Sequence, residues 1–419
     1  MTAGYGELLR SPHVLRLLSG TLVGRLPHGT APLAIVLFTR AEGGGYTLAG
    51  ALAAVHGLAT AVGQPLLGRL VDLRGQRVMF PAALVSALAM VAFALLGTEP
   101  LPVAAALVLL AGLTTPPLEG ALRALWSTVL GSAERVRRAY ALDAVAQEVM
   151  FAGGPLLVML LVAVWSEAAA LLVINAVGLL GALTVVVSEP SRRWRGEQRE
   201  AHWLGALRSG GLLALLGCFL CVGMALGAIS VAAVAYADAR GDEWVASYLL
   251  SALGVGALVG GLWYGARPWA GAPEPRLLAL VSVLAAGYLP LALVPGSVAL
   301  MTLFAGLAGV ALAPSLACAF AVIDRHAPRG TVTEAFSWLV TTFGVGAAVG
   351  TAVAGPAVEW GEEGAGFLVA GVSGCLAVLV LLATRRVLAV PEAPSEAPPE
   401  SRNDRNAALE PGFRSGHQA

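Results

Sequence analysis

The chain has 419 residues, of which 57% are hydrophobic and only 12% are charged, and its mean hydropathy is +0.78. This composition excludes an ordinary soluble domain, in which about a quarter of the residues are charged. The formal net charge is zero and no basic block with interleaved aromatic residues is present, so nucleic acid is not an expected partner.

Apolar stretches of about 20 residues, each long enough to cross a hydrocarbon core of about 30 Å, recur along almost the whole chain. They predict an all-α integral membrane protein embedded in a lipid bilayer. The twelve predicted transmembrane helices lie near residues 14–38, 47–69, 78–97, 102–125, 139–164, 167–188, 210–235, 246–266, 276–294, 297–322, 333–357 and 364–384.

The longest polar joint, residues 189–209, separates the sixth and seventh spans and divides the chain into two six-helix halves, residues 1–188 and 210–386. Residues 387–419 are polar and proline-rich, and we expect them to form a disordered tail. Most of the 26 basic residues, all of them arginine, lie in the joints on the side of the membrane where both termini are expected. The positive-inside rule therefore predicts cytoplasmic termini at the plasma membrane.

The most specific motif is GRLVDLRGQR, at the end of the second predicted span. A glycine-rich turn lets two helices approach closely, and an acid there can bond amides or arginines at a neighbouring helix end. The segment resembles the G-x-x-x-D-[RK]-x-G-[RK]-[RK] loop of the major facilitator superfamily, from which it departs at Leu73 and Gln76. The matching positions are Gly68, Asp72, Gly75 and Arg77.

The resemblance implies a twelve-helix secondary transporter in which these four residues form a gating loop that holds the outward-facing state. A segment with weaker similarity to the motif, GGLWYGAR, begins at Gly260, 192 residues after Gly68. It has Tyr264 in place of the acid. The same offset aligns FAGGP at 151–155 with FGVGA at 343–347. Two coincidences at one offset indicate duplicated halves, with a substrate site near the membrane midplane between them.

Ionisable residues inside the spans are the first candidates for that site. Arg25 lies in the first span, where a charge costs at least about 2.5–3.5 kcal/mol on insertion scales unless it has a partner or a wet cavity. His28 shares its face, and Pro27 and Pro32 loosen the helix. Glu148 lies about 15 Å into the fifth span. We expect Arg25 and Glu148 to face a central cavity, where Glu148 either pairs permanently with Arg25 or carries a proton that alternates with the substrate.

Three further residues complete the candidate substrate and proton pathway. Glu119 and Arg123 stand four residues apart in the fourth span and are expected to form an ion pair. Asn175 is a single polar group in the sixth span.

Two other polar features have structural interpretations. Asp143 lies near the cytoplasmic end of the fifth span and is expected to pair with Arg137 or Arg138. Thr331 and Glu334 form a T-x-x-E capping box, which predicts that both side chains bond free amides at the start of the eleventh span.

The resulting hypothesis is proton-coupled efflux of a small organic molecule by a monomer, without cofactor or metal. One alternative is uptake of a carboxylated or sugar-like solute, with Arg25 holding an anion. A second is a membrane-embedded transferase, but neither D-D-x-x-D motifs nor a histidine cluster for a metal is present. No G-x-x-x-x-G-K-[ST] loop for ATP is found either.

Overall fold

The computed structural model describes residues 5–197, 203–242, 244–360 and 364–389. Its first-half helices are α1 Tyr5–Arg10, α2 Val14–Gly24, α3 Leu26–Ala41, α4 Tyr46–Arg74, α5 Met79–Leu96, α6 Leu101–Leu113, α7 Leu118–Leu130, α8 Ala133–Val164 and α9 Glu167–Val186. The 189–209 joint contains α10 Glu189–Arg193 and the short 3-10 helix η2 Gly205–Arg208. The second-half helices are α11 Gly210–Asp238, α12 Trp244–Ala266, α13 Pro273–Tyr288, α14 Val298–Gly309, α15 Leu312–His326, α16 Val332–Trp360, α17 Gly364–Ala383 and α18 Arg385–Leu388.

The twelve predicted spans are confirmed as helical segments. Within the described residues, eleven helical segments are long and apolar enough to cross a membrane. The remaining span is the first along the chain. It consists of α2 followed by α3, two shorter helices that meet at Arg25. Of the predicted disordered tail, residues 390–419 lie outside the described part of the chain, and α18 extends to Leu388.

Three spans are interrupted, and each interruption comes just before or at a proline. Proline lacks an N–H and its ring crowds the carbonyl four residues earlier, which favours a kink or a break in the turn before it. Pro27 follows the break at Arg25, Pro116 and Pro117 lie between α6 and α7, and Pro314 follows the break between α14 and α15. After the second and third breaks, α7 and α15 bury most of their residues.

The helix boundaries repeat between the two halves. Arg74 and Ala266, the last residues of α4 and α12, are 192 positions apart, which is the offset found between the two motif-like segments. The broken span α6–α7 has its counterpart in the broken span α14–α15 at nearly the same offset. The repeat therefore extends to the helices and their interruptions.

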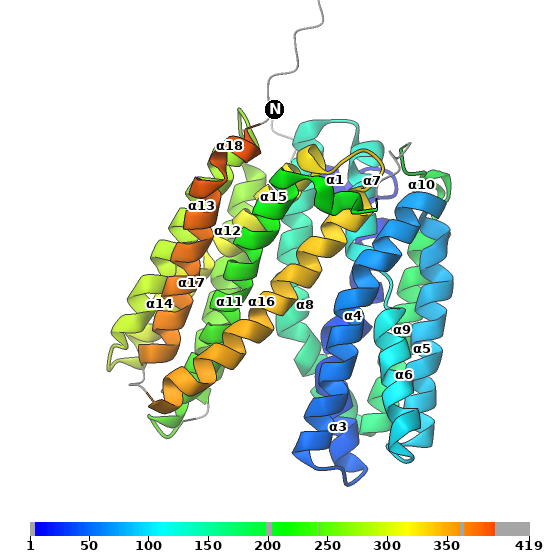
Figure 1. Ribbon diagram of the computed structural model, residues 1–419, viewed down its shortest axis with the longest axis vertical. Helices are drawn as coiled ribbons and strands as arrows, with labels where there is room; N and C mark the ends of the chain where they lie inside the picture. The colour runs from blue at the N-terminus through cyan, green and yellow to red at the C-terminus, as the bar shows by residue number, and fades with distance from the viewer. Residues whose placement is uncertain (1–4, 198–202, 243, 361–363, 390–419) are drawn as a thin grey trace, which may run out of the picture. The chain divides into compact units, whose positions relative to one another are not determined.

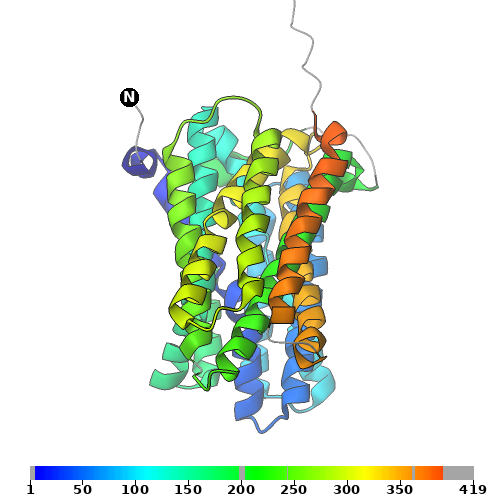
Figure 2. The same ribbon diagram turned by 90° about the vertical axis from the view of Figure 1, so that its left-hand side faces the viewer.

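The two halves meet most closely at the end of the helices that carries residues 68–77, which we call the motif end. There α16 packs against α4 and α7, while α8 packs against α12 and α15. One buried apolar cluster includes residues of both halves at this end. Figure 1 shows α4 and α16 lying close together at the motif end and diverging toward the other end, and Figure 2 shows the helices of the second half side by side.

A glycine at the α12–α14 contact provides a test of this packing. A Cβ atom on Gly260 would lie 1.8 Å from the carbonyl oxygen of Val310, whereas one on Gly254 would meet nothing within 4 Å. We expect Gly260→Ala to lower the thermal unfolding midpoint of the purified protein by several degrees, since overpacking costs about 1–3 kcal/mol. Gly254→Ala is the matched control, and equal midpoints for both variants would contradict the close contact.

Candidate functional site

A buried network of polar side chains joins the first span to α7 and α8. Arg25 donates hydrogen bonds to Glu119 Oε1 at 2.9 Å and to Asp143 Oδ1 at 2.9 Å. Its third contact is Gln147 Oε1 at 3.2 Å. Arg123 donates to Asp143 Oδ2 at 2.7 Å and to Gln147 Oε1 at 3.1 Å. We call these five residues the Arg25 network.

The formal charges of the Arg25 network balance. Two guanidinium groups face two carboxylates, and the second ion pair of Glu119 joins its Oε2 to Arg123 Nη2 at 3.5 Å. The side chains are nearly inaccessible, with exposed fractions of 0% for Arg123 and Asp143 and 7% for Glu119. Removal of one partner would leave an uncompensated buried charge, which is strongly destabilising.

A cavity of about 500 Å³ lies beside the network, between the two halves. Its wall on the first half is mixed: it contains apolar residues such as Pro32 and Leu58 and the polar side chains of His28, His56, Gln64, Glu119, Arg123 and Gln147. Its wall on the second half is formed mostly by apolar side chains of α15 and α16, among them Leu316, Phe320, Leu339, Val340, Phe343 and Val345. The charged groups of the lining therefore lie on one wall and the other wall is mostly apolar, which suits an amphipathic molecule.

Aromatic rings connect the network to the second half. The Arg123 guanidinium lies over the Phe320 ring, 3.7 Å from its centroid. Phe320, Phe336 and Tyr140 pack against one another with centroids 5.9–6.1 Å apart. All three rings are almost fully buried, so they close the space between the halves beside the network.

Asp72 joins the halves at the motif end. Its Oδ1 accepts a hydrogen bond from the amide of Thr333 at 3.1 Å, and its Oδ2 accepts one from the amide of Glu334 at 2.8 Å. These are free amides of the first turn of α16, where a negative charge is also favoured by the helix dipole. The carboxylate at the end of α4 therefore caps a helix of the other half.

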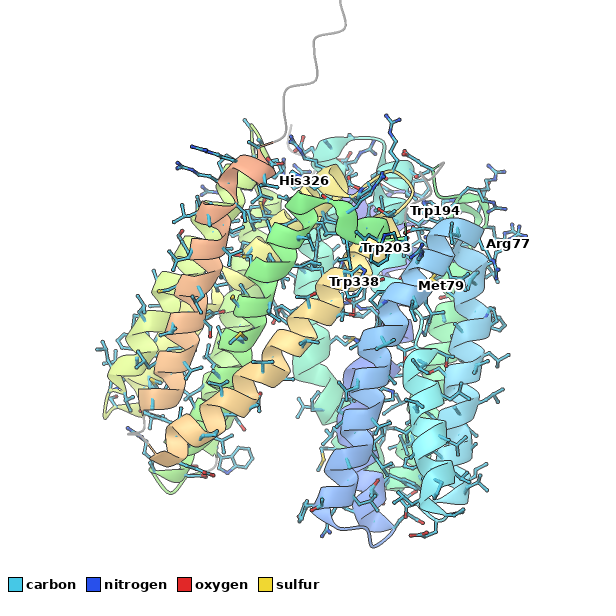
Figure 3. All side chains as sticks on the ribbon, viewed as in Figure 1. Arg77, Met79, Trp194, Trp203, His326 and Trp338 are labelled. Carbon is cyan, nitrogen blue, oxygen red and sulfur yellow. The ribbon has the colours of Figure 1, made fainter. Side chains whose placement is uncertain are left out.

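The motif glycines permit this contact. A Cβ atom on Gly68 would lie 2.6 Å from Ser337 Oγ of α16, so only glycine allows α4 to approach so closely. Gly75 has a φ of +86°, a conformation that side chains disfavour, in the turn after α4. Arg77 is exposed and lies at the outer edge of the first half, whereas Trp203 and Trp338 lie near the contact of α4 with α16 (Figure 3).

The equivalent contact in the second half uses different chemistry. Tyr264, at the position of the missing acid, is fully buried, and its hydroxyl accepts a hydrogen bond from Arg276 of its own half at 3.3 Å. The halves are joined here by Arg137 of α8, which donates to the carbonyls of Arg267 and Trp269 at 3.1 and 3.2 Å.

The N-terminal helix α1 adds a bond on this side. The Tyr5 hydroxyl donates to the carbonyl oxygen of Leu262 in α12 at 2.9 Å. Partial burial raises the pKa of Tyr5 above its ordinary value, so the hydroxyl keeps the proton that it donates.

Two other predicted site residues, His28 and Asn175, lie behind the network. A second cavity of about 30 Å³ lies inside the first half and is lined by Arg25, His28, Gln64, Glu119 and Asn175, among others. It is large enough for one water molecule. His28, Gln64 and Glu119 line both cavities, whereas Asn175 lines only the inner one and donates to the carbonyl of Leu171 at 2.9 Å.

Glu148 lies on another face of α8. It does not line the central cavity, and the described residues provide it with no hydrogen bond or ion pair. Val145, three residues earlier, packs against Gly261 of α12, so this face of α8 is directed at the second half.

Two expectations about pairing are wrong, and neither Arg25 nor Glu148 is among the described residues that line the central cavity. Arg25 binds Glu119 and Asp143 rather than Glu148. Asp143 binds Arg25 and Arg123, and not Arg137 or Arg138, because it points into the first half.

The expected capping box is also not formed. The Thr331 hydroxyl donates to the Pro328 carbonyl at 2.7 Å, and the amides of Thr333 and Glu334 bond Asp72 instead. The physical reason is that a charged acceptor from another helix is a stronger partner for these amides than a neighbouring hydroxyl. The predicted pair of Glu119 with Arg123 is present at 3.5 Å.

Sequence reasoning missed Gln147 and Phe320. Gln147 stands four residues after Asp143, the same spacing that separates Glu119 from Arg123, and this repetition would have indicated two facing polar stripes. Phe320 carries no such signal, since an aromatic residue in an apolar span is common.

Comparisons with known proteins agree with this architecture. A family model described as Major Facilitator Superfamily matches residues 17–306, and no curated protein matches the chain. A bacterial homologue of the iron transporter ferroportin, solved in an outward-facing state, is 16% identical with a TM-score of 0.71 and covers 89% of this chain and 99% of its own.

Two further solved structures are similar. The E. coli fucose:proton symporter is 14% identical with a TM-score of 0.67, covering 88% of this chain and 98% of its own. A human organic anion transporter is 17% identical with a TM-score of 0.64, at the same coverage. At these identities the likeness concerns the fold alone.

The Arg25 network predicts a large effect on stability. We expect Asp143→Asn to lower the free energy of unfolding by about 3–5 kcal/mol, because Arg25 and Arg123 both lose a charged partner. Glu189→Gln is the control, since Glu189 pairs with Arg193 at the surface, where 47% and 81% of their side chains are exposed, and such pairs contribute about 0–1 kcal/mol. Denaturant unfolding in detergent measures both, and similar losses would contradict the network.

The Asp72 contact predicts a conformational effect. We expect Asp72→Asn to raise the population that is open at the motif end by about tenfold, because charge-assisted hydrogen bonds each contribute about 1.5–3 kcal/mol. Spin labels on α4 at Arg74 and before α16 at Arg329, in a cysteine-free background, report this population by double electron–electron resonance.

Arg77→Gln serves as the comparison variant in that experiment. Its side chain is exposed, so the distance distribution should stay as in the parent protein. A shift as large as that of Asp72→Asn would give Arg77 the gating role that the motif implies, and no shift in either variant would remove that role from Asp72.

Proposed function

The chain belongs to the Major Facilitator Superfamily, and we propose that it is a secondary active transporter that exports a small, largely apolar organic molecule in exchange for protons. The observation that carries this proposal is the cavity of about 500 Å³ between the halves, with one wall from each half. A site between two duplicated halves can be exposed to each side of the membrane in turn when the halves rock against each other.

The arrangement of contacts supports alternating access. The halves are held together at the motif end by Asp72 on one side and by Arg137 and Tyr5 on the other. The arginine distribution favours a cytoplasmic motif end. We therefore assign this conformation to the state that is closed toward the cytoplasm, in which the gating loop is engaged.

The cavity lining favours an amphipathic organic substrate over a strongly polar one. The wall formed by α15 and α16 is mainly apolar and aromatic. Uptake of a carboxylated solute would need a free cation, but Arg25 already donates to Glu119, Asp143 and Gln147. The alternative in which Arg25 holds an anion is therefore less well supported than export.

Glu119 is our first candidate for the coupling acid. It is the carboxylate that lines the central cavity among the described residues, and its Oε2 has only the 3.5 Å ion pair with Arg123. Proton binding there would weaken the ion pairs next to the substrate site, so proton and substrate would bind alternately. Glu148 is the second candidate, because it lies at similar depth on the face of α8 that meets the second half.

A vesicle assay tests both the export and its coupling. Everted membrane vesicles with an acidic lumen are given labelled chloramphenicol, an uncharged amphipathic probe. We expect accumulation that stops when a protonophore collapses the gradient. Glu119→Gln should reduce gradient-driven accumulation at least about tenfold, while gradient-independent exchange of the probe persists.

Glu148→Gln is measured in parallel as the matched variant. If it alone abolishes the gradient dependence, the coupling acid is Glu148 rather than Glu119. Accumulation in vesicles that survives the protonophore would contradict proton coupling altogether, and equal probe levels with and without the protein would contradict export of this class of molecule.

A further inference from the structure

The charge around the central cavity is balanced within the first half. Among the described lining residues, the charged ones are Glu119 and Arg123, which face each other at 3.5 Å. Arg25 and Asp143, directly behind them, add one charge of each sign. The second half contributes no charged side chain to the described lining.

This balance limits what the cavity can hold. An ion that enters a space of low dielectric needs a counter-charge to replace its water, and here both carboxylates and both guanidiniums are already paired. A substrate that carries a full positive or negative charge would leave the cavity with an uncompensated charge. An uncharged molecule would not.

Besides the ion pair of Glu119 with Arg123, the described lining carries the polar side chains of His28, His56 and Gln64, and some of its buried polar atoms have no partner. Arg123 Nη1 and Glu119 Oε2 are buried and have no hydrogen-bond partner within the described part of the chain. The same holds for His28 Nδ1, and all three residues line the cavity. A neutral group that both accepts and donates hydrogen bonds can satisfy atoms of both kinds.

We propose that the cavity selects uncharged amphipathic molecules whose polar group both donates and accepts a hydrogen bond, such as a carboxamide, and that the net charge of the Arg25 network sets this selection. The proposal rests on the proposed function and specifies the substrate class of the same cavity. The apolar body of the molecule lies against α15 and α16, and its polar group faces Glu119 and Arg123.

The network offers a pair of isosteric substitutions that change its charge in opposite directions. Glu119→Gln removes one negative charge and keeps an oxygen to accept from Arg25. Gln147→Glu adds one negative charge at an oxygen that already accepts from Arg25 and Arg123 at 3.2 and 3.1 Å, so the protein has donors to hold it. The double variant carries both changes and restores a net charge of zero.

Equilibrium binding to the full-length protein in lipid nanodiscs at pH 7 tests the proposal without requiring transport. Three probes share one apolar body and differ in charge: naphthalene-1-acetamide, naphthalene-1-acetate and 2-(1-naphthyl)ethylamine. We expect the parent protein to bind the amide at least about tenfold more tightly than either ion, which corresponds to about 1.4 kcal/mol. Glu119→Gln should then prefer the carboxylate, Gln147→Glu the amine, and the double variant the amide again.

Glu134→Gln is the control, because it removes a carboxylate at the rim of α8 that pairs with Arg138 and not with the network. Its order of preference should equal that of the parent protein. The proposal would be overturned if the parent protein, the two single variants and the double variant all showed the same order of preference among the three probes. It would also be overturned if the parent protein bound none of the probes. The vesicle assay measures gradient-driven export independently of this binding assay. Failure of the selectivity and failure of the transport function are therefore distinguishable.

Discussion

The ion pairs between Arg25 and the carboxylates of Glu119 and Asp143 are the interaction on which the rest of the first half depends. A guanidinium deep in a membrane protein needs compensating charge, and here the two carboxylates come from different helices, Glu119 from α7 and Asp143 from α8. Satisfying Arg25 therefore determines how α7 and α8 are rotated against the first span. That rotation in turn places Glu119, Arg123 and Gln147 in the wall of the central cavity.

The halves are related by duplication, yet their contacts at the motif end are not equivalent. On one side an acid of α4 accepts hydrogen bonds from the first turn of α16. On the other side the acid has become the buried Tyr264, and Arg137 of α8 donates to backbone carbonyls after α12. Both solutions satisfy backbone groups that a helix end leaves free, one with an acceptor and the other with donors.

Hydrophobic periodicity predicted the spans to within a few residues, since lipid imposes helix length and leaves few alternatives. Pro27 indicated a weakened helix near Arg25. The glycines that flank Asp72 indicated that another helix approaches α4 closely there. The partners of the buried charges could not be derived in the same way. Asp143 and Glu148 are five residues apart on one helix, which places them about 140° apart around its axis, and depth along the helix alone does not reveal which face meets Arg25. That choice depends on how α8 is rotated, and the rotation follows from the ion pairs of Arg25 together with packing across the whole bundle, neither of which the spacing along one helix contains.

The way in which Arg123 contacts the second half is consistent with halves that move against each other. Its charge is compensated by Asp143 within its own half, and its contact with Phe320 is a stack of a guanidinium on a ring face. A stack of this kind can slide or open without leaving a buried ion unpaired, whereas a salt bridge across the same seam would cost the separation of two charges in a medium of low dielectric. Keeping every strong ion pair of the network inside one half therefore lowers the barrier to rocking. The hydrogen bonds of the buried Asp72 at the motif end are left to hold the closed state.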